Sequence, residues 1–363
     1  MRILYFSRDY TTHDHRFLNA IVSGGHEVYY VKLERNLRQV EDRLIPAQVE
    51  QLQWAGAQGL FRWRDLPRLA MDFRRVVKGI GPDLVHAGPI QTCAFIAVLS
   101  GFRPILAMSW GFDLMDDVHK NKWMEWVTRY TLRRSTFFTS DAIVTRDKAV
   151  AYGVNPDKTV VFPWGVDLEQ FKPSAANRPS SAFTLFCNRS WEPRYGVDVL
   201  ARAFVKVAQE KENVDLILLG GGSQGNRIRQ ILLNGGVMDR VTFGGQVSQT
   251  DLPRWYHMAD LYLSPSHVDG SSVSLMEALA CGLPALVSDI PANQEWVSEG
   301  ENGWLFPDGD SNALAAKILA AMSQREKLAE MGRIGRRSAE KRADWKKNAA
   351  VLMDIYRSIT QGN

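Results

Sequence analysis

The sequence contains few cysteines, and none of them has the spacing that cysteine chemistry needs. Only three of the 363 residues are cysteine: Cys93, Cys187 and Cys281. They are far apart and form neither a C-x-x-C pair nor an even-numbered framework of bridges. This excludes a small domain held together by disulfides, and we expect buried, reduced thiols in a cytoplasmic protein.

Long hydrophobic runs are also missing. The longest apolar run, CAFIAVLSGF at 93–102, is too short to cross a bilayer. The N-terminal MRILYFSRDY is apolar for only four residues before Ser7, Arg8 and Asp9, which does not fit a signal peptide. The sequence therefore predicts a cytoplasmic location, with contact to the inner face of a membrane as an open alternative.

An excess of charge of one sign is not present either. The net charge is +4 and the pI is about 8.9. This mild basicity suits anionic small molecules or a membrane surface. Because no nucleic-acid motif accompanies it, we expect no nucleic-acid partner.

The fingerprints of common cofactor and metal sites are missing as well. LLGGGSQGNRI at 218–228 is rich in glycine, but no acidic residue about twenty positions later completes a dinucleotide site, so an oxidoreductase is disfavoured. His13-x-His15 has no third metal ligand nearby. Asp308-x-Asp310 precedes a helical pattern, where Asp310 is expected to cap the helix. We therefore predict no metal and no cofactor.

Short apolar runs alternate with helical patterns along the chain, which predicts mostly parallel, covered sheets of an α/β protein. A stretch rich in Pro, Ser, Ala and Asn at 168–183 is typical of a linker and separates two similar series. Helices are expected at 14–23, 196–210 and 225–235. Strands are expected at 2–6, 26–33, 82–88, 104–110, 142–146 and 159–164, and then at 183–188, 214–222, 241–245, 261–266 and 284–289.

The second series contains a recognisable segment. LYLSPSHVDGSSVSLMEALACGLPALVSD at 261–289 resembles the nucleotide-sugar-binding segment of family-4 retaining glycosyltransferases, in which two glutamates are separated by seven residues. Here Asp269 and Glu277 have that spacing. NRSWEPRYGVDVLARAF at 188–204 is similar to the family's phosphate-contacting segment, and WKKNAAVLMDIY at 345–356 to its last helix.

This resemblance implies a GT-B fold, in which two Rossmann-like domains face each other across a cleft and the C-terminal helix crosses back to the first domain. The expected domains are 1–170 with 346–363, on the acceptor side, and 171–345, which binds the nucleotide sugar. Some positions depart from the family pattern. The first acid is Asp269 instead of glutamate, the basic pair is Arg189 and Arg194, and Trp110 stands where a histidine is common.

Two interpretations of the acidic pair are open from the residues. Ser274 and Glu277 fit the S-x-x-E capping box, whereas the resemblance implies that Glu277 accepts hydrogen bonds from the ribose hydroxyls. Asp269 is either an ordinary turn residue or the acceptor of hydrogen bonds from the transferred sugar.

The residues between the two acids offer backbone N–H groups at a helix start, where a diphosphate is attracted. Arg189 and Arg194 are either surface ion-pair residues or the cations that stabilise the leaving diphosphate. The resemblance implies that Gly221 lets the nucleotide approach the backbone and that Gln246 and Val247 flank its base. The helix-start residues are Gly270, Ser271, Ser272, Val273 and Ser274.

The first domain offers weaker candidates. Asp9, His13, Arg16 and His86 lie near predicted strand ends, where they either contact the donor sugar or the acceptor or have structural roles. Asp113, in SWGFD, is a candidate catalytic residue by its position in the first-domain loop that the resemblance implicates.

Basic and aromatic residues alternate in LFRWRDLPRLAMDFRRVVK at 60–78, which has six basic and two acidic residues, close to Trp54, Phe61, Trp63 and Phe73. HKNKWMEWVTRYTLRRS at 119–135 repeats the pattern with Trp123 and Trp126. Such faces suit an anionic bilayer surface, but helix packing against the first sheet explains them equally well.

The sequence therefore predicts a metal-independent, retaining hexosyltransferase. It would move a sugar from a nucleotide diphosphate sugar, with UDP assumed as the commonest base, to a hydroxyl of a glycan or glycolipid in polysaccharide biosynthesis. Two alternatives stay open: a GT-B nucleotide-sugar epimerase, and a non-catalytic protein that binds sugar nucleotides.

Overall fold

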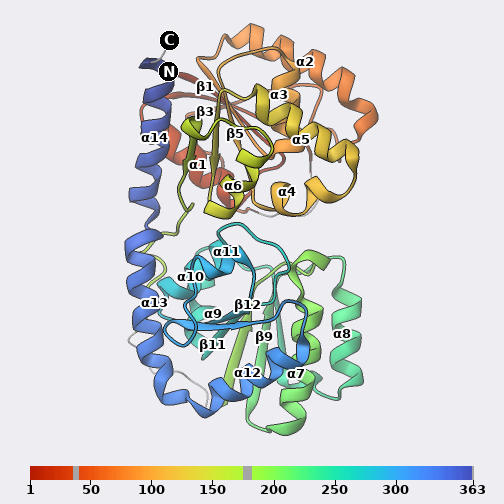
Figure 1. The fold of residues 1–363 in the computed structure, drawn as a ribbon, viewed down its shortest axis with the longest axis vertical. Coiled ribbons are helices and arrows are strands. Elements are labelled where there is room, and N and C mark those ends of the chain that lie inside the picture. Colours follow the sequence, from red (N-terminus) through yellow and green to blue (C-terminus); the bar gives the residue numbers. More distant parts are fainter. Residues whose placement is uncertain (36–40, 175–181, 362–363) are drawn as a thin grey trace. The chain divides into compact units, whose positions relative to one another are not determined.

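The computed structural model describes residues 1–35, 41–174 and 182–361. The chain divides into two compact units, and Figure 1 colours them along the sequence. Unit 1 is Met1–Trp164 with Lys347–Asn363, and unit 2 is Gly165–Lys346. The first boundary lies six residues before the predicted 170/171, and part of the predicted linker, 175–181, lies outside the described residues.

Within the described residues, unit 1 contains a parallel sheet of seven strands in the order β3-β2-β1-β4-β5-β6-β7. The strands are β1 (Arg2–Ser7), β2 (Glu27–Lys32), β3 (Val49–Gln51), β4 (Leu84–Ala87), β5 (Ile105–Met108), β6 (Phe137–Ser140) and β7 (Thr159–Val161). The helices are α1 (Thr12–Ser23), α2 (Leu66–Ile80), α3 (Phe95–Leu99), α4 (Phe112–Met115), α5 (Lys122–Arg134), α6 (Ile143–Ala151) and α14 (Trp345–Gln361).

Alternation along β1 explains why helices cover both faces of this sheet. Leu4 and Phe6 pack in the same buried cluster as Phe73 of α2, and Tyr5 on the opposite face packs against Phe17 of α1. Figure 1 accordingly shows α1 and α14 on one side of the sheet and α2, α3 and α5 on the other. The first unit is thus a three-layer α/β/α structure.

In the described part of unit 2, a second parallel sheet has six strands in the order β10-β9-β8-β11-β12-β13. The strands are β8 (Phe183–Cys187), β9 (Val214–Leu219), β10 (Val241–Gly245), β11 (Leu261–Ser264), β12 (Ala285–Ser288) and β13 (Gly303–Phe306). The helices are α7 (Val197–Glu210), α8 (Gly225–Asn234), α9 (Leu252–Met258), α10 (Val273–Ala280), α11 (Pro291–Gln294), α12 (Ser311–Ser323) and α13 (Leu328–Arg342).

The strand order of unit 2 is that of a Rossmann-type sheet, with the first strand in the sequence at its centre. Leu185 and Cys187 of β8 pack toward α7, α8 and α12, while Phe186 between them packs toward α9 and α10. The direction of winding reverses between β8 and β11. Loops after the carboxyl ends of these two strands are where such sheets bind ligands.

Several expected elements differ from the structure. The run at 142–146 was predicted as a strand, but Ile143–Ala151 is helix α6 and the strand is β6, a few residues earlier. Strands β3 and β13 were not predicted. Most other predicted strands overlap observed ones, and the two-unit α/β architecture is confirmed.

Helix α14 completes the core of unit 1. From Lys347 onward it belongs to that unit, where Leu352 and Tyr356 are fully buried and the Tyr356 hydroxyl lies 2.7 Å from His86 Nδ1 on β4. All three cysteines are in the described part of the chain, and each is buried and outside any disulfide. No helix of the described residues is both long and apolar enough to span a membrane.

Candidate active site

An arginine and an aspartate meet at the point where the sheet of unit 2 changes direction. Arg189 follows β8 and Asp269 follows β11, 80 positions later, and Arg189 Nη2 donates to Asp269 Oδ2 at 2.7 Å. Only 10% of the Arg189 side chain and 15% of the Asp269 side chain are exposed. The two side chains that the sequence singled out are therefore direct partners.

Close backbone packing holds the two loops together. A Cβ on Gly196 would lie 2.1 Å from the Pro265 carbonyl oxygen, and the φ of Gly196 is +59°, so only glycine fits there. The His267 N–H also donates to the Arg194 carbonyl oxygen at 2.9 Å. The loop after β8 is consequently fixed against the loop after β11.

The ionisation of the pair follows from its burial. Burial alone would lower the pKa of Arg189, but the Asp269 carboxylate outweighs this, so the pKa is raised and the guanidinium stays protonated. Burial raises the pKa of Asp269, and Arg189 offsets only part of that effect. The site thus keeps a permanently charged and largely buried guanidinium, which is paired with Asp269.

The same guanidinium reaches the start of helix α10. Arg189 Nη1 donates to Ser272 Oγ at 2.8 Å and to Ser274 Oγ at 2.9 Å. The guanidinium carbon of Arg189 also lies over the Tyr195 ring, 4.4 Å from the ring centroid. Ser272 is the N-cap, accepting from the Leu275 N–H. The capping-box interpretation of Ser274 and Glu277 is therefore wrong, because the helix begins at Val273.

Glu277 lies one turn further along α10 and is buried, with 3% exposure. Its Oε2 is 2.8 Å from the Tyr256 hydroxyl, which also lies 3.0 Å from the Ser274 carbonyl oxygen. Asn188, beside Arg189, donates to the same hydroxyl at 2.8 Å. Burial, and then the Glu277 charge, raise the pKa of Tyr256 well above its usual range, so this hydroxyl keeps its proton.

Trp296 supports the loop from behind and was not predicted. Its Nε1 donates to Ser271 Oγ at 3.0 Å, and the Arg342 guanidinium lies 4.4 Å from its ring centroid. Neither residue belongs to a motif that the sequence analysis used, so no local signal pointed to a role for them. The Trp296 indole thus fixes the Ser271 side chain, and the backbone N–H of the adjacent Gly270 donates a hydrogen bond to the Asp269 carboxylate.

The glycine run after β9 lies beside the same loops. The Trp191 N–H donates to the Gly221 carbonyl oxygen at 3.0 Å. A Cβ on Gly222 would lie 2.6 Å from the Trp191 backbone, and Gly220 has a φ of +82°. At Gly221 a Cβ would meet nothing within 4 Å, so this glycine borders open space.

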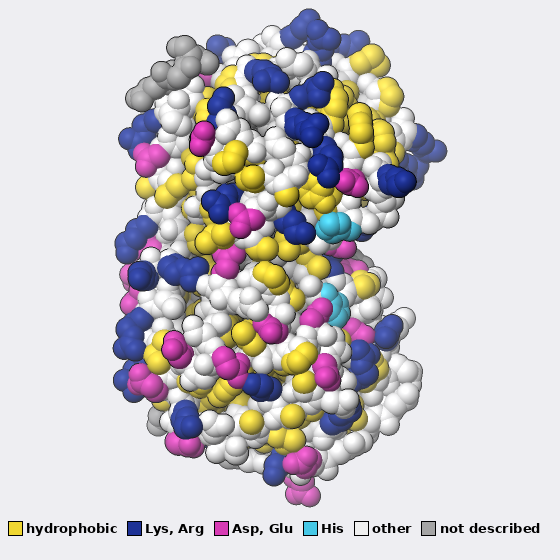
Figure 2. Space-filling model, in the orientation of Figure 1, with side chains coloured by type: hydrophobic (Ala, Val, Ile, Leu, Met, Phe, Trp, Pro, Cys, Tyr) yellow, Lys and Arg dark blue, Asp and Glu magenta, His cyan; other side chains and the backbone are white. Residues whose placement is uncertain are grey.

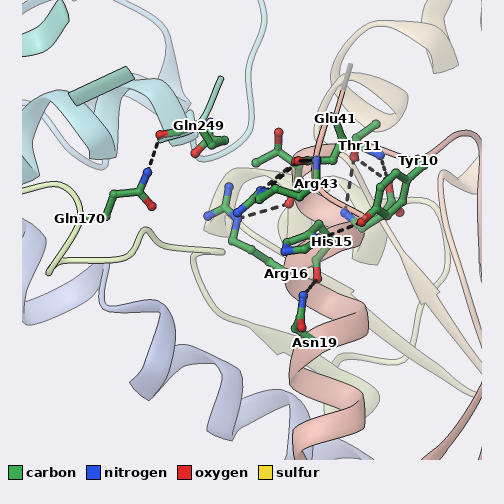
Figure 3. Close-up of polar contacts among 11 residues, drawn as sticks. Tyr10, Thr11, His15, Arg16, Asn19, Glu41, Arg43, Gln170 and Gln249 are labelled. Carbon is green, nitrogen blue, oxygen red and sulfur yellow. Dashed lines mark hydrogen bonds and ion pairs between the residues drawn. The ribbon is translucent and has the colours of Figure 1, made fainter. Parts of the chain in front are cut away.

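The remaining predicted residues of unit 2 are peripheral. Gln246 is exposed, and Val247 is partly buried against the core cluster of α9 and α10. Figure 3 shows the Gln170 amide bonded to the Gln249 carbonyl oxygen just beyond them. Arg194 is half-buried in the turn before α7.

A histidine–aspartate pair near the two loops was also missed. His267 Nδ1 lies 2.6 Å from Asp308 Oδ1, and Asp310 caps α12 as predicted, accepting from the N–H groups of Asn312 and Ala313. No group of three or more His, Cys, Asp or Glu side chains that could hold a metal occurs in the described ranges.

In unit 1, polar residues gather at the start of α1, just after strand β1. Figure 3 shows Tyr10, His15, Arg16, Glu41 and Arg43 there. The Tyr10 hydroxyl is 2.8 Å from His15 Nδ1, and Glu41 and Arg43 form a two-pronged ion pair with both distances 2.8 Å. Arg16 is the predicted member of this group.

Two other predicted residues lie close to it in the sequence. Asp9 Oδ1 accepts from the Tyr10 N–H at 2.8 Å. The His13 ring packs edge-on against Trp164 and Trp110, with centroids 4.7 and 5.7 Å away. Trp110, found where the family commonly has histidine, therefore belongs to an aromatic cluster.

Two predicted residues of unit 1 are fully buried. His86 lies on β4, where burial lowers its pKa to about 3 and the Tyr356 hydroxyl lies 2.7 Å from its Nδ1. Burial also raises the pKa of Asp113 to about 6, and its carboxylate accepts from Ser109 Oγ and from the N–H groups of Ile90, Trp110 and Leu114, which fixes a loop. The sugar contact of His86 and the catalytic role of Asp113 stay predictions, which these internal partners do not favour.

Two family models match the chain side by side. The model described as Glycosyltransferase Family 4 matches residues 11–170, and the model described as Glycosyl transferases group 1 matches residues 169–338. Together they cover residues 11–338, which includes most of each unit.

Characterised relatives cover parts of the chain. Phosphatidyl-myo-inositol mannosyltransferase of Mycobacterium leprae is 33% identical over 205 residues, which is 55% of this chain and 54% of the relative. GDP-mannose-dependent alpha-(1-6)-phosphatidylinositol monomannoside mannosyltransferase of Mycobacterium tuberculosis is 27% identical over 293 residues, 75% of this chain and 74% of the relative. The chain thus spans about half the length of the first of these relatives.

Solved structures are similar over the whole chain. Sucrose-phosphate synthase from Thermosynechococcus elongatus has a TM-score of 0.84 at 19% identity and covers 100% of both chains. Anabaena HepE in complex with UDP and glucose has a TM-score of 0.79 at 19% identity, covering 99% of this chain and 100% of that one. At these identities the likeness concerns the fold.

Proposed function

The chain belongs to the group 1 glycosyl transferase family and has its GT-B fold, and from this premise we propose that it transfers a sugar from a nucleoside diphosphate sugar to an acceptor hydroxyl with retention of configuration. We place the donor in unit 2. UDP is the proposed base, supported by the UDP complexes among its structural neighbours, with GDP as the rival that a mannosyltransferase relative suggests.

One observation carries this proposal: the cluster in which Arg189, the N-terminus of α10 and Glu277 follow one another at the switch point of unit 2. A buried guanidinium beside free helix N–H groups attracts a diphosphate. A carboxylate one turn further on suits the paired hydroxyls of a ribose. The order of these groups therefore matches the order of parts in a nucleoside diphosphate.

In the proposed reaction the bond between the sugar C1 and the β-phosphate oxygen breaks, while the acceptor oxygen bonds to C1 from the same face. The acceptor proton goes to the leaving phosphate. Arg189 stabilises the charge that develops there, which makes a divalent metal unnecessary in the proposal. Asp269 then orients hydroxyls of the transferred sugar after Arg189 turns to the phosphate. A trapped glycosyl-enzyme intermediate would contradict this scheme.

We assign the acceptor to unit 1 and propose that it is a glycan or a lipid-linked glycan, with the protein at the periphery of a membrane. The names of the mycobacterial relatives, which act on phosphatidylinositol derivatives, support a lipid acceptor. The two alternatives differ from this proposal in their reactions. A nucleotide-sugar epimerase would convert the donor without an acceptor, and a non-catalytic binding protein would bind the donor without converting it.

The test begins with thermal unfolding in the presence of UDP, GDP, ADP and their sugars. A ligand at 100 times its Kd should add about 2.7 kcal/mol to the free energy of unfolding. Candidate acceptors are then added, and NMR of the product reads the anomeric configuration. Interconversion of donors without acceptor would favour the epimerase, and stabilisation without any turnover would favour the binding protein.

Replacing Gly221 by alanine should separate donor binding from folding. The added methyl meets nothing within 4 Å, so the free energy of unfolding should change by less than about 0.5 kcal/mol. If the nucleotide lies against Gly221, its Kd should rise about tenfold, a cost of ~1.4 kcal/mol. Calorimetric titration with the stabilising nucleotide measures this.

Gly222→Ala is the matched control, since its methyl would strike the Trp191 backbone and destabilise the protein itself. An unchanged Kd in Gly221→Ala would remove the glycine run from the donor site.

Trp296→Phe should weaken donor binding through Ser271. Phenylalanine keeps a ring in the buried position but loses the 3.0 Å hydrogen bond to Ser271 Oγ, worth about 1 kcal/mol. We expect a several-fold rise in donor KM with little change in kcat. Ser271→Ala removes the same bond, so the double variant should be no worse than either single one. Fully additive effects on KM would show that the bond does not position the loop.

A further inference from the structure

Unit 1 exposes tryptophans in an unusual number. Trp63, just before α2, and Trp123 and Trp126, in α5, are 37%, 46% and 48% exposed. They are the exposed tryptophans of the described residues. Of the other aromatic residues around segment 60–78, Trp54 and Phe73 are buried, and Phe61 is partly buried against the core. Helix packing thus explains part of the pattern but leaves these three rings in solvent.

The three rings form one continuous group. Trp63 and Trp123 are 5.7 Å apart between centroids, and Trp123 stacks on Trp126 at 5.0 Å. Tyr130 continues the row at 5.1 Å from Trp126, and the Arg134 guanidinium lies 3.9 Å from its ring. Phe95 of α3 supports the group from beneath, 6.3 Å from Trp63 and 6.5 Å from Trp123. The buried Phe95 ring thus supports the exposed tryptophan rings from the protein side.

Exposed residues on α2, three of them basic, continue from the aromatic row. They recur every three or four positions, which places them on one side of the helix: Arg68, Met71, Arg75 and Lys78. Segment 62–78 has six basic and two acidic residues, an excess equal to the net +4 of the whole chain. The positive charge is therefore concentrated beside the exposed tryptophans.

Figure 2 shows Lys and Arg side chains mixed with hydrophobic ones over the part of unit 1 where Figure 1 draws α2 and α5. We call this the basic aromatic surface, and its members are Trp63, Arg68, Met71, Arg75, Lys78, Trp123 and Trp126.

We propose that the basic aromatic surface docks unit 1 on the headgroups of an anionic phospholipid bilayer. Tryptophan rings partition to the headgroup level, where one edge is apolar and the other is wet. Arginine and lysine keep their charge at the phosphates while their stems cover apolar surface. A second copy of the chain fits less well, since it would place like charges opposite each other.

This inference rests on the proposed function in one respect, because a lipid-linked acceptor would be met at such a surface. The docking itself needs neither donor nor acceptor. Vesicle binding can therefore fail while donor-dependent stabilisation persists, and the reverse can also occur.

The test is co-sedimentation of the full chain with vesicles of phosphatidylcholine alone and of phosphatidylcholine mixed with phosphatidylglycerol. We expect binding to the mixed vesicles that salt weakens, and quenching of tryptophan fluorescence by iodide that falls on binding. Changing Arg68, Arg75 and Lys78 together to glutamine should lower the partition coefficient about 100-fold, at roughly fivefold per charge.

Matched controls come from unit 2. Lys327, which precedes α13, and Arg333 and Arg337 within it are all exposed. Changing the three together to glutamine removes the same charge and should leave binding within about twofold of the parent after the small change in net charge. Trp123→Ser with Trp126→Ser should reduce binding several-fold, whereas Leu233→Ser, at a site 60% exposed on α8, should not.

Equal binding to both vesicle types, equal losses in the two glutamine variants, or unchanged binding of the tryptophan variant would each overturn the proposal. So would sedimentation velocity showing that the tryptophan variant turns a dimer into a monomer, because the surface would then be covered by a second copy. Thermal stabilisation by nucleotides, measured on the same variants, shows that each still folds and binds donor.

Discussion

Replacement of Glu277 by alanine should remove most of the thermal stabilisation that nucleotides give. Two hydrogen bonds from a ribose to a buried carboxylate, at about 1.5 kcal/mol each, correspond to a roughly 100-fold weaker Kd. At a concentration that adds about 2.7 kcal/mol to the parent, the variant should then gain only about 0.4 kcal/mol. Thermal unfolding with and without nucleotide measures both values.

Two further variants separate the proposed direct contact of Glu277 with the ribose from the support that Tyr256 gives to its carboxylate. Tyr256→Phe leaves the carboxylate in place but removes the hydroxyl 2.8 Å from its Oε2, so nucleotide binding should weaken less than in Glu277→Ala. Glu277→Gln keeps the side-chain shape and serves if alanine unfolds the protein. Undiminished stabilisation of Glu277→Ala by every nucleotide would refute the assignment of the ribose site.

Replacement of Arg189 should produce the largest loss of turnover. Removal of one preorganised donor to a developing charge costs about 10²–10³ in kcat, and Arg189 is the buried cation of the switch point. Arg189→Lys keeps a positive charge but has no fork to reach Asp269 and both serines at once. We expect kcat to fall more than donor KM rises, as steady-state kinetics would show.

Arg189→Ala should also reduce stability, because it leaves the Asp269 carboxylate buried without its cation, at a cost of about 3–5 kcal/mol. Loss of the guanidinium raises the pKa of Asp269 further, so the folded variant takes up a proton more readily than the unfolded chain does. The stability deficit relative to the parent should thus be greatest at neutral pH and shrink as the pH falls through the raised pKa.

Asp269→Asn is the matched control, since it frees Arg189 without removing the cation. Its effect should fall on sugar-dependent steps, with binding of the bare nucleoside diphosphate largely kept. If Arg189→Lys had parental kcat, or Asp269→Asn lost the nucleoside diphosphate as completely as Glu277→Ala, the division of roles would be wrong.

The sequence predicted the fold well where apolar runs were bounded by clear breaks. Strands β1, β2, β8 and β9 are of this kind, with β-branched or aromatic residues between turns. The strand predicted at 142–146 was wrong because a short apolar run is equally typical of a buried strand and of the start of a helix. Strand β13 was missed because GWLF is short and follows a turn-rich stretch.

The sequence singled out several members of the candidate site but not their contacts. Arg189 and Glu277 were chosen from the resemblance of two segments to a family, yet nothing local shows that Arg189 would pair with Asp269, because that contact depends on β8 and β11 being neighbours. Trp296 and Tyr256 were missed for a related reason. Each acts on the site from another element, and neither is marked by spacing.

In unit 1 two predicted residues are buried. His86 was chosen for its place near a predicted strand end and Asp113 for its place in the first-domain loop that the resemblance implicates, but both lie beneath the surface with internal partners. Burial cannot be told from exposure for a single polar residue in an apolar run. Partners such as Tyr356, 270 positions away, are visible only in the folded chain.

The position of α14 has a consequence for how this protein is made. Residues from Lys347 onward fill the core of unit 1, with Leu352 and Tyr356 against the sheet that the first strands build. A ribosome makes the chain from its N-terminus, so unit 2 has all of its residues outside the exit tunnel before unit 1 does. The unit that is translated first is therefore completed last, and His86 can meet Tyr356 only after all of unit 2 has been made.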